Sequence, residues 1–217
     1  MSIGVISVKN KDYWEKHYAE TTSENNPNLV FFKSFIETYK DQISSPVLDL
    51  GCGDGRLLNI LYKKGVNDLF GVDFSENAVS LARNKFSQID FLLGDIYNLG
   101  NLFEENFFSL ITSSMSLHHE SYADSKHALL DWSSILKKEG LLYLLTRSDS
   151  SLRGNEPKIK ESTYFLEYIG KNRVHFNRHS LEAIIPLELD ILEFGEVKYF
   201  GRSGAPIASW KVILKKR

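Results

Sequence analysis

The first two thirds of the chain alternate short apolar runs with amphipathic segments. The apolar runs predict buried strands at residues 46–50, 69–74, 89–93, 107–113 and 140–146. Apolar side chains recur at helical spacing in the segments around them, and this period predicts helices over 27–43, 56–64, 76–86 and 124–137. Strands that alternate with helices in this way form βαβ units, so we expect a parallel sheet with helices on both faces.

Single residues mark where some of these elements begin and end. Gly65 follows the helix over 56–64 and suits the position just after a helix C-terminus. Ser75 is a natural N-cap for the helix that begins at residue 76. We expect Gly140 to close the helix over 124–137.

The alternation stops after residue 146. A polar stretch and an aromatic segment lead to a short helix near 179–185, followed by strands at about 187–200 and 206–215. The glycine-bearing turn between these strands predicts a hairpin. We therefore expect a three-layer α/β sandwich whose mostly parallel seven-stranded sheet ends in an antiparallel hairpin. It should form one domain. Residues 1–45 are expected to be a helical cover, 46–146 the core, 147–180 an insert, and 181–217 a terminal helix and hairpin.

Composition narrows the class of protein. The 217 residues carry a formal net charge of −2, which argues against the large basic surface of a nucleic-acid-binding protein. Cys52 is the single cysteine, so an internal disulfide framework is excluded, and no spacing of His, Asp and Glu indicates a metal site. There is no signal-peptide pattern at the N-terminus and no apolar run near the ~20 residues that span a bilayer. We expect a cytoplasmic protein without metal or membrane segment.

A glycine loop carries the strongest chemical signal. The segment Asp49-Leu50-Gly51-Cys52-Gly53-Asp54-Gly55 lies between a predicted strand and a predicted helix. Glycines allow a ligand to approach the backbone closely, and the N-terminus of the following helix favours electronegative groups. The dinucleotide fingerprint G-x-G-x-x-G/A requires a small residue where Arg56 stands, which disfavours an NAD-dependent enzyme.

Asp49, Gly51, Gly53 and Gly55 match the pattern D/E-x-G-x-G-x-G, so the loop resembles motif I of the class I S-adenosylmethionine (SAM)-dependent methyltransferases. The resemblance implies a Rossmann-like fold and SAM as the methyl donor. An acidic residue at the position of Asp49 can receive the α-ammonium group of SAM. The segment 136–140 is similar to the Leu-Lys-Pro-Gly turn of the family, with glutamate in place of proline.

The resemblance continues through the following strands. Asp73 stands 20 residues after Gly53, where the family uses a carboxylate for the ribose hydroxyls, and Phe74 stands where a ring can cover the adenine. Asp95 occupies the position that reads the adenine edge. The cofactor-binding residues implied by the resemblance are Asp49, Gly51, Cys52, Gly53, Gly55, Asp73, Phe74, Asp95, Ile96, Ser114, Met115 and Tyr18.

Three side chains are candidates for a catalytic base, which methyl transfer needs when the acceptor is a weak nitrogen or hydroxyl nucleophile. His118 and His119 follow the fourth strand, where histidines in the family also serve only to pack or to hydrogen-bond. Tyr18 is the third candidate. His175 and His179 could share a helix face, but a helix cap formed by residues 177–179 is the better interpretation.

Aromatic residues gather in two segments outside the predicted cofactor core. The segment Tyr13–Ala19 resembles the N-terminal helix that closes over SAM in many small-molecule methyltransferases, and for Trp14 and Tyr18 covering and packing are equal alternatives. We expect Phe32 and Phe35 to pack on the sheet. The second segment contains Tyr164, Phe165, Tyr168 and Phe176.

Charge is unevenly distributed. Residues 66–125 contain nine acidic and two basic side chains, whereas residues 151–180 contain six basic and three acidic ones. The basic insert suggests an acceptor with a carboxylate or phosphate, or is a solvated loop. The sequence thus predicts a SAM-dependent methyltransferase acting on a small molecule. A protein or RNA acceptor and a non-catalytic SAM-binding domain stay open as alternatives, and the oligomeric state is not assigned.

Overall fold

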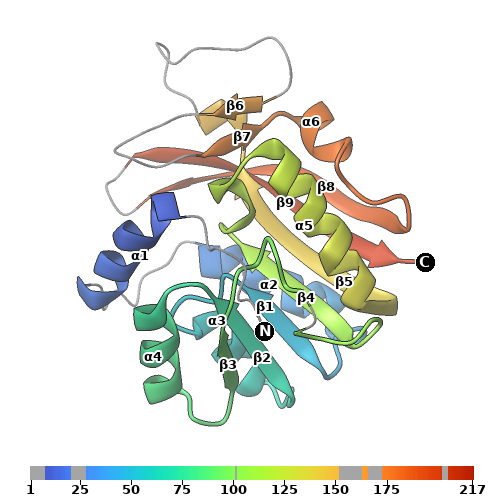
Figure 1. Ribbon diagram of the computed structural model, residues 1–217. Helices are drawn as coiled ribbons and strands as arrows, with labels where there is room; N and C mark the ends of the chain where they lie inside the picture. Colours follow the sequence, from blue (N-terminus) through green and yellow to red (C-terminus); the bar gives the residue numbers. More distant parts are fainter. Residues whose placement is uncertain (1–7, 21–27, 101, 152–162, 166–172, 202–204) are drawn as a thin grey trace.

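The computed structural model describes residues 8–20, 28–100, 102–151, 163–165, 173–201 and 205–217 (Figure 1). The strands are β1 (Val47–Leu50), β2 (Leu69–Asp73), β3 (Asp90–Leu93), β4 (Phe108–Ser114), β5 (Leu136–Arg147), β6 (Thr163–Phe165), β7 (Val174–Phe176), β8 (Leu189–Phe200) and β9 (Pro206–Lys216). The helices are α1 (Val8–Glu20), α2 (Asn28–Tyr39), α3 (Arg56–Tyr62), α4 (Glu76–Lys85), α5 (Tyr122–Ile135) and α6 (Arg178–Glu182), with short 3₁₀ turns at Leu117–His119 and Asp149–Ser151.

Seven strands form one sheet in the order β3-β2-β1-β4-β5-β9-β8. The first five run parallel, and β9 pairs antiparallel with both β5 and β8. This confirms the predicted α/β, Rossmann-like sheet that ends in an antiparallel hairpin. The chain reverses its direction across the sheet between β1 and β4, and ligands of open α/β sheets bind at such a switch point.

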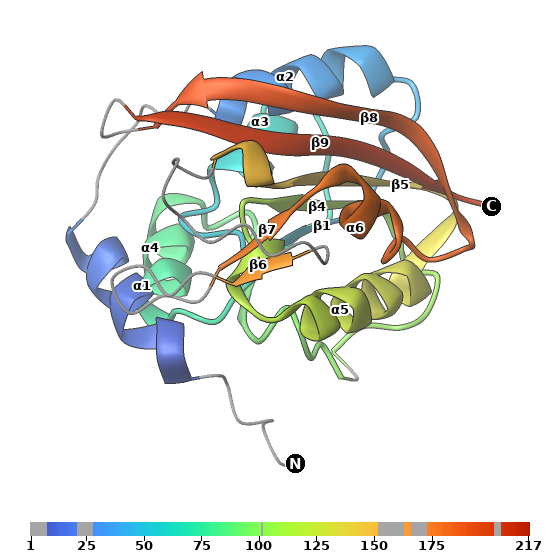
Figure 2. The same ribbon diagram turned by 90° about the horizontal axis from the view of Figure 1, so that it is seen from above.

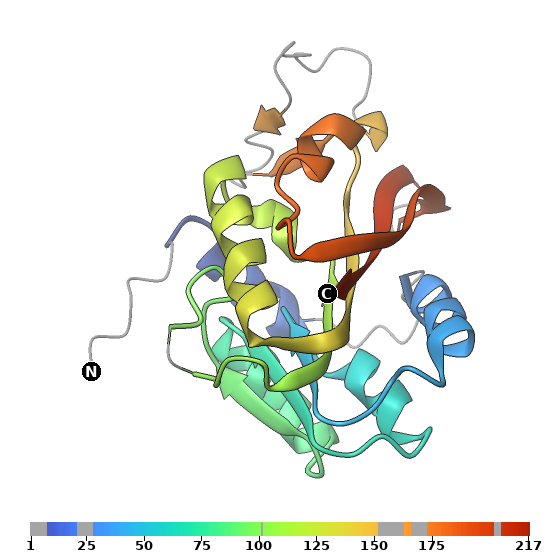
Figure 3. The ribbon, with the colours of Figure 1, turned by 90° about the vertical axis from the view of Figure 1, so that its right-hand side faces the viewer.

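Helices cover both faces of the sheet, and each face buries its own apolar cluster (Figures 2 and 3). Side chains alternate along β1, so that Leu48 and Leu50 pack with α5 and α6 while Val47 packs with α2, α3 and α4. Phe32 and Phe35 of α2 are buried with their ring centroids 5.3 and 4.9 Å from that of Tyr143, which confirms their predicted packing role.

The predicted helix signals act as expected at three positions. The hydroxyl of Ser75 accepts a hydrogen bond from the backbone N–H of Ala78 at 3.1 Å and caps α4. Gly65 adopts a φ of 86° after α3. The side-chain oxygen of Asn177 accepts from the N–H of Ser180 at 2.8 Å, which caps α6. His175 lies in β7 and not on a helix with His179.

The predicted end of the helix over 124–137 is wrong. Helix α5 ends at Ile135 and the chain enters β5 directly at Leu136, so Gly140 does not close the helix. Leu136 pairs with Phe108 and is fully buried, which fixes it in the sheet. The residues between Leu136 and Leu141 form a bulge in which Glu139 takes a φ of 64°. The short antiparallel pair β6–β7 was not predicted.

Candidate active site

The carboxyl ends of the parallel strands meet at one edge of the sheet, where a cavity of about 330 Å³ opens. A second cavity of about 90 Å³ adjoins it, and both are lined by His17, Tyr18, Gly51 and Ser114. The predicted cofactor residues that line one or both cavities are Tyr18, Asp49, Gly51, Cys52, Gly53, Asp73, Phe74, Asp95, Ile96, Ser114 and Met115. Gly55, the remaining one, lies outside both.

The glycine loop after β1 follows the path that its sequence requires. Gly51 and Gly53 have φ values of 75° and 53°, a region that favours glycine. A Cβ on Gly51 would collide with Ser116, and a Cβ on Gly53 would collide with the hydroxyl of Tyr18. Gly55 has a φ of 77°, and a Cβ there would meet the Phe91 ring in the core, so backbone conformation and packing together explain that glycine.

Asp73, the last residue of β2, ties the glycine loop to the start of α4. Its Oδ2 accepts from the N–H of Gly53 at 2.9 Å and its Oδ1 accepts from the N–H of Ser75 at 3.0 Å. Burial raises the pKa of this carboxyl to about 6, although the backbone N–H groups oppose the shift. Each carboxylate oxygen keeps a lone pair, so the side chain can still accept hydrogen bonds from ligand hydroxyls.

Asp49 is buried at the wall of the smaller cavity. Burial raises its pKa to about 7, because the hydrogen bond from the Thr112 hydroxyl at 2.7 Å offsets the cost only in part and the charges of Asp73 and Asp54 add to it. A cation beside this carboxylate would favour its ionised form. The smaller cavity is therefore suited to a positively charged group.

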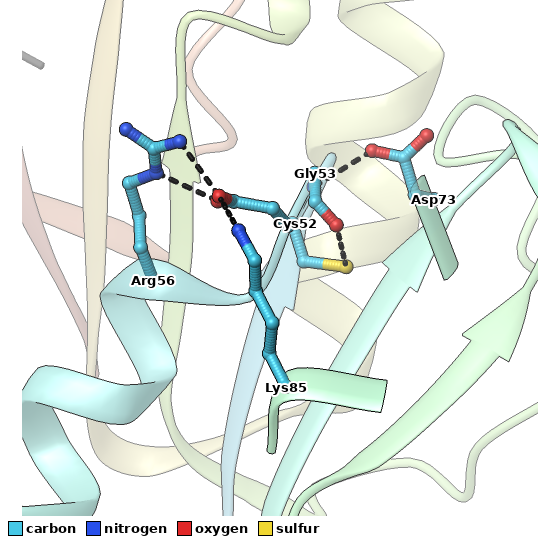
Figure 4. A network of polar contacts seen from close by, with 6 residues as sticks. Cys52, Gly53, Arg56, Asp73 and Lys85 are labelled. Atoms are coloured by element: carbon cyan, nitrogen blue, oxygen red, sulfur yellow. Dashed lines mark hydrogen bonds and ion pairs between the residues drawn. The ribbon is translucent and has the colours of Figure 1, made fainter. Parts of the chain in front are cut away.

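A network of charges fixes the outer side of the loop (Figure 4). Arg56 donates two hydrogen bonds of 2.6 Å to the Asp54 carboxylate, and Lys85 of α4 donates a third at 3.0 Å. Burial would raise the pKa of Asp54, but these two cations lower it overall. The loop is thus anchored to α3 and α4. The thiol of Cys52 packs in the apolar cluster beneath it.

Asp95 and Ile96 follow β3 and line the larger cavity. The Oδ1 of Asp95 accepts from the N–H of Tyr97 at 2.9 Å, and burial raises the pKa of the carboxyl. The carbonyl of Ile96 accepts from the indole N–H of Trp132 at 2.8 Å, which fixes the backbone at this point. The half-buried carboxylate therefore has a defined orientation toward a ligand in the cavity.

Helix α1 lines one side of the larger cavity and is bound to the N-terminus of α4. The carboxylate of Glu15 accepts from the N–H groups of Glu76 and Asn77 at 2.8 and 3.0 Å, and from the hydroxyl of Ser75 at 3.1 Å. It thereby satisfies free N–H groups at the N-terminus of another helix. The Trp14 ring meets the His119 ring edge-on, with centroids 5.2 Å apart.

His118 and His119 line the larger cavity next to Trp14 of α1. His119 donates from Nε2 to the carbonyl of Met115 at 3.1 Å. His118 is 1% exposed, and within the described residues its Nδ1 has no hydrogen-bond partner. Burial lowers the pKa of His118 well below its usual value, and the nearby positive groups of Arg147 and Arg173 contribute. His118 is therefore a neutral imidazole at pH 7.

Comparison with known proteins identifies the family of the central segment of the chain. A model of the methyltransferase domain family matches residues 47–140, the segment that contains the glycine loop and the three aspartates. Residues 47–140 form a methyltransferase domain. The demethylmenaquinone methyltransferase of Thermotoga maritima is 26% identical over 142 residues, which cover 65% of this chain and 53% of the relative. A human mitochondrial arginine-hydroxylase is 36% identical over 94 residues, which cover 43% of this chain and 26% of the relative.

The chain therefore spans about half of the bacterial relative and a quarter of the human one. Among solved structures, a SAM-dependent methyltransferase from Methanosarcina mazei has a TM-score of 0.71 at 18% identity, covering 84% of this chain and 96% of that one. This likeness supports the fold of the chain, including the parts outside residues 47–140.

The cofactor of a methyltransferase domain of this class is SAM, and the residues present fit it. The glycine loop leaves room for close contact with backbone, and Asp49 offers a carboxylate to the α-ammonium group. Asp73 offers free acceptor sites to the ribose hydroxyls, and Asp95 lies where an adenine amino group would be read. The implied roles of these residues stay predictions that binding measurements test.

Two of the three candidate bases, Tyr18 and His118, differ in their ability to accept a proton at neutral pH. Burial raises the pKa of Tyr18 well above its usual value, with the charge of Asp73 adding to the shift, so its hydroxyl keeps its proton at pH 7. Tyr18 can donate a hydrogen bond but cannot act as a base at neutral pH. His118 is neutral and buried at the cavity wall, which makes it the better candidate.

Several residues of the site were not found from the sequence. Tyr97 donates from its hydroxyl to the carbonyl of Ser116 at 2.9 Å and accepts from the N–H of His119, so it supports the histidine turn. Arg147 ends β5, and the rule that found the aspartates at strand ends applies equally to it. Arg173 lies just before β7 and belongs to the basic insert whose charge suggested an anionic acceptor, but its place at the cavity was not predicted. Tyr199 of β8 also lines the larger cavity.

Some expectations concern residues outside the described ranges. Tyr168 and most of the basic insert, including Arg153, Lys158, Lys160 and Lys171, fall there. Within the described ranges, no three His, Cys, Asp or Glu side chains gather as a metal site would require. No helix in that part of the chain is both long and apolar enough to cross a bilayer.

Proposed function

We propose that the protein is a SAM-dependent methyltransferase that transfers a methyl group to a small anionic molecule. The observation that carries the proposal is the arrangement of Asp49, Asp73 and Asp95 around the glycine loop, at two adjoining cavities of which the larger extends to His118. The first two carboxylates suit the ammonium and ribose groups of SAM, and the third suits its adenine.

When bound, SAM would supply a sulfonium methyl group that passes to the acceptor by direct displacement, with S-adenosylhomocysteine as the leaving group. The chain must hold the acceptor in line with that group at about 3 Å, and such positioning alone can lower the barrier by several kcal/mol. Neutral His118 can take the proton that a hydroxyl or nitrogen acceptor loses. Trp14 and Tyr18 cover the cavity and limit the access of water.

A small acceptor is supported by the way the cavity is covered. Tyr18 and Trp14 of α1 line one side of it, and Tyr199, Gly201 and Ile207 at the β8–β9 turn line the other. The cavity between these elements measures about 330 Å³, a size that suits a small molecule. The Thermotoga relative is named for a small-molecule substrate, demethylmenaquinone, which is consistent with this size of acceptor.

The cofactor half of the proposal is tested by calorimetric titration with S-adenosylhomocysteine, the demethylated product. We expect micromolar or tighter binding, and a loss of at least tenfold in D73N and in D95N. D90N is the matched control, because Asp90 is exposed at the opposite end of β3. No binding to the unaltered protein, or equal binding by D73N, D95N and D90N, contradicts the proposed cofactor site.

A further inference from the structure

The wall of the larger cavity that faces away from the cofactor residues is positively charged. Arg147 lies at the carboxyl end of β5 and Arg173 lies directly before β7, and both line the cavity together with His118. In the sheet, β1 and β4 separate β2 from β5. At roughly 4.8 Å per strand, the arginine side is therefore about 14 Å from the Asp73 side.

Both arginines are half-buried, and no carboxylate of the described residues pairs with either of them. Within the described part of the chain, neither makes an ion pair, and the Nε of each is buried without a hydrogen-bond partner. The other four arginines of the described residues all have acceptors, namely Asp54 for Arg56, the Phe91 carbonyl for Arg83, Glu182 for Arg178 and Asp190 for Arg217. Among the arginines that the structure describes, Arg147 and Arg173 therefore differ from the rest.

Burial makes it energetically unfavourable for both guanidinium groups to be charged without a bound anion. Burial lowers the pKa of both guanidinium groups, and the charge of Arg173 adds to the shift at Arg147. Both arginines also lower the pKa of His118. Guanidinium groups keep their charge in proteins, so the cost is not relieved by deprotonation. Asp73 and Asp95, which also line the cavity, do not relieve it either, because they accept from backbone N–H groups on the side of β2 and β3.

We propose that Arg147 and Arg173 form an oxyanion-binding subsite that takes a carboxylate or phosphate group of the methyl acceptor. The inference rests on the proposed function for the identity of the ligand as acceptor. Each guanidinium presents a planar fork of N–H donors that matches the oxygens of a carboxylate or phosphate. An anion bound there compensates both charges at once.

The subsite also orients the acceptor. A group held by Arg147 and Arg173 lies beside His118, and the remainder of the molecule extends toward Gly51 and Ser114, where the two cavities meet. The acceptor atom is then on the cofactor side of the histidine. Residues of β5 and directly before β7 thus bind the anion, whereas the glycine loop and β4 position the nucleophile.

Matched pairs of ligands test the subsite. Benzoate is compared with benzamide, and phenyl phosphate with phenol, by calorimetry on the full chain with and without saturating S-adenosylhomocysteine. We expect one anion to bind at least tenfold more tightly than its neutral partner, and the two pairs distinguish carboxylate from phosphate. The preference should fall roughly 10- to 100-fold in R147Q and in R173Q, the usual loss for a hydrogen bond between charged groups. R217Q, at an exposed arginine away from the cavity, should keep it.

Thermal unfolding separates a binding role from a structural one. Because R147Q and R173Q each remove an uncompensated, partly buried charge, neither substitution should lower the Tm of the ligand-free protein. Benzoate or phenyl phosphate should raise the Tm of each variant less than it raises the Tm of the unaltered protein. No preference for either anion up to about 10 mM, or an unchanged preference in both variants, overturns the inference. Binding of S-adenosylhomocysteine is read independently, so failure of the cofactor site is told apart from failure of the subsite.

Discussion

Glu15 is the contact by which α1 is held over the cavity, and its removal should weaken cofactor binding without unfolding the core. In E15Q one oxygen can still accept from Glu76 or Asn77, while the amide group faces the other backbone N–H. The variant therefore loses one hydrogen bond to a charged group and the interaction of a negative charge with the N-terminus of α4. For a half-exposed carboxylate these sum to about 1–2 kcal/mol.

That free energy corresponds to a roughly 5- to 30-fold smaller population of docked α1. Since α1 brings Trp14 and Tyr18 to the cavity, we expect S-adenosylhomocysteine to bind E15Q about 5- to 30-fold more weakly by calorimetry. Hydrogen exchange of the α1 amides should accelerate by a similar factor. D12N, at an exposed position of the same helix, is the control. Unchanged affinity together with unchanged exchange in E15Q refutes the role of Glu15 as the contact that holds α1.

Three further predictions concern the loop and the two wall residues. The ligand-free protein should lose stability as the pH rises from about 4 to about 7. In this range folded Asp49, with its pKa raised to about 7, still holds a proton that the unfolded chain has released. The Tm of D49N should depend less on pH, and the same pH dependence of Tm in both proteins would contradict the raised pKa. In G53A the free energy of unfolding should fall by about 1–3 kcal/mol and most S-adenosylhomocysteine binding should be lost, because φ at residue 53 is 53° and the new Cβ would collide with Tyr18. The control is G195A, where a Cβ meets no atom within 4 Å, and urea unfolding should give it nearly the stability of the unaltered protein. H118Q should lower kcat by roughly 10²- to 10⁴-fold for a hydroxyl or nitrogen acceptor with cofactor affinity unchanged, and an unaltered kcat would show that His118 only packs.

The order of the strands and the cofactor side of the site could be predicted from the sequence because they rest on local signals. Buried parallel strands are short apolar runs, and the polar residue that ends each of them lies at the same edge of the sheet. Asp49, Asp73 and Asp95 follow from that rule, and all three line the cavities. Ser75 was identified as a cap because its role depends only on the next three residues.

Features that depend on distant contacts were missed. Leu136 fits the period of α5 as well as that of a strand, and only its pairing with Phe108 decides for the strand. Glu15 caps a helix 61 residues further along the chain, which no local pattern reveals. Strands β6 and β7 have three residues each, too few for a periodic signal. The single domain, the absence of a metal and the cytoplasmic location stay predictions.

Transfer of a labelled methyl group tests the central claim most directly. The protein is incubated with methyl-labelled SAM and a dialysable pool of cell metabolites, and the products are analysed by mass. The account predicts a new methylated small molecule that carries a carboxylate or phosphate, formed at a lower rate by R147Q and H118Q. Tight binding of S-adenosylhomocysteine with no label transferred to any small molecule, or label found only in protein or RNA, would contradict it.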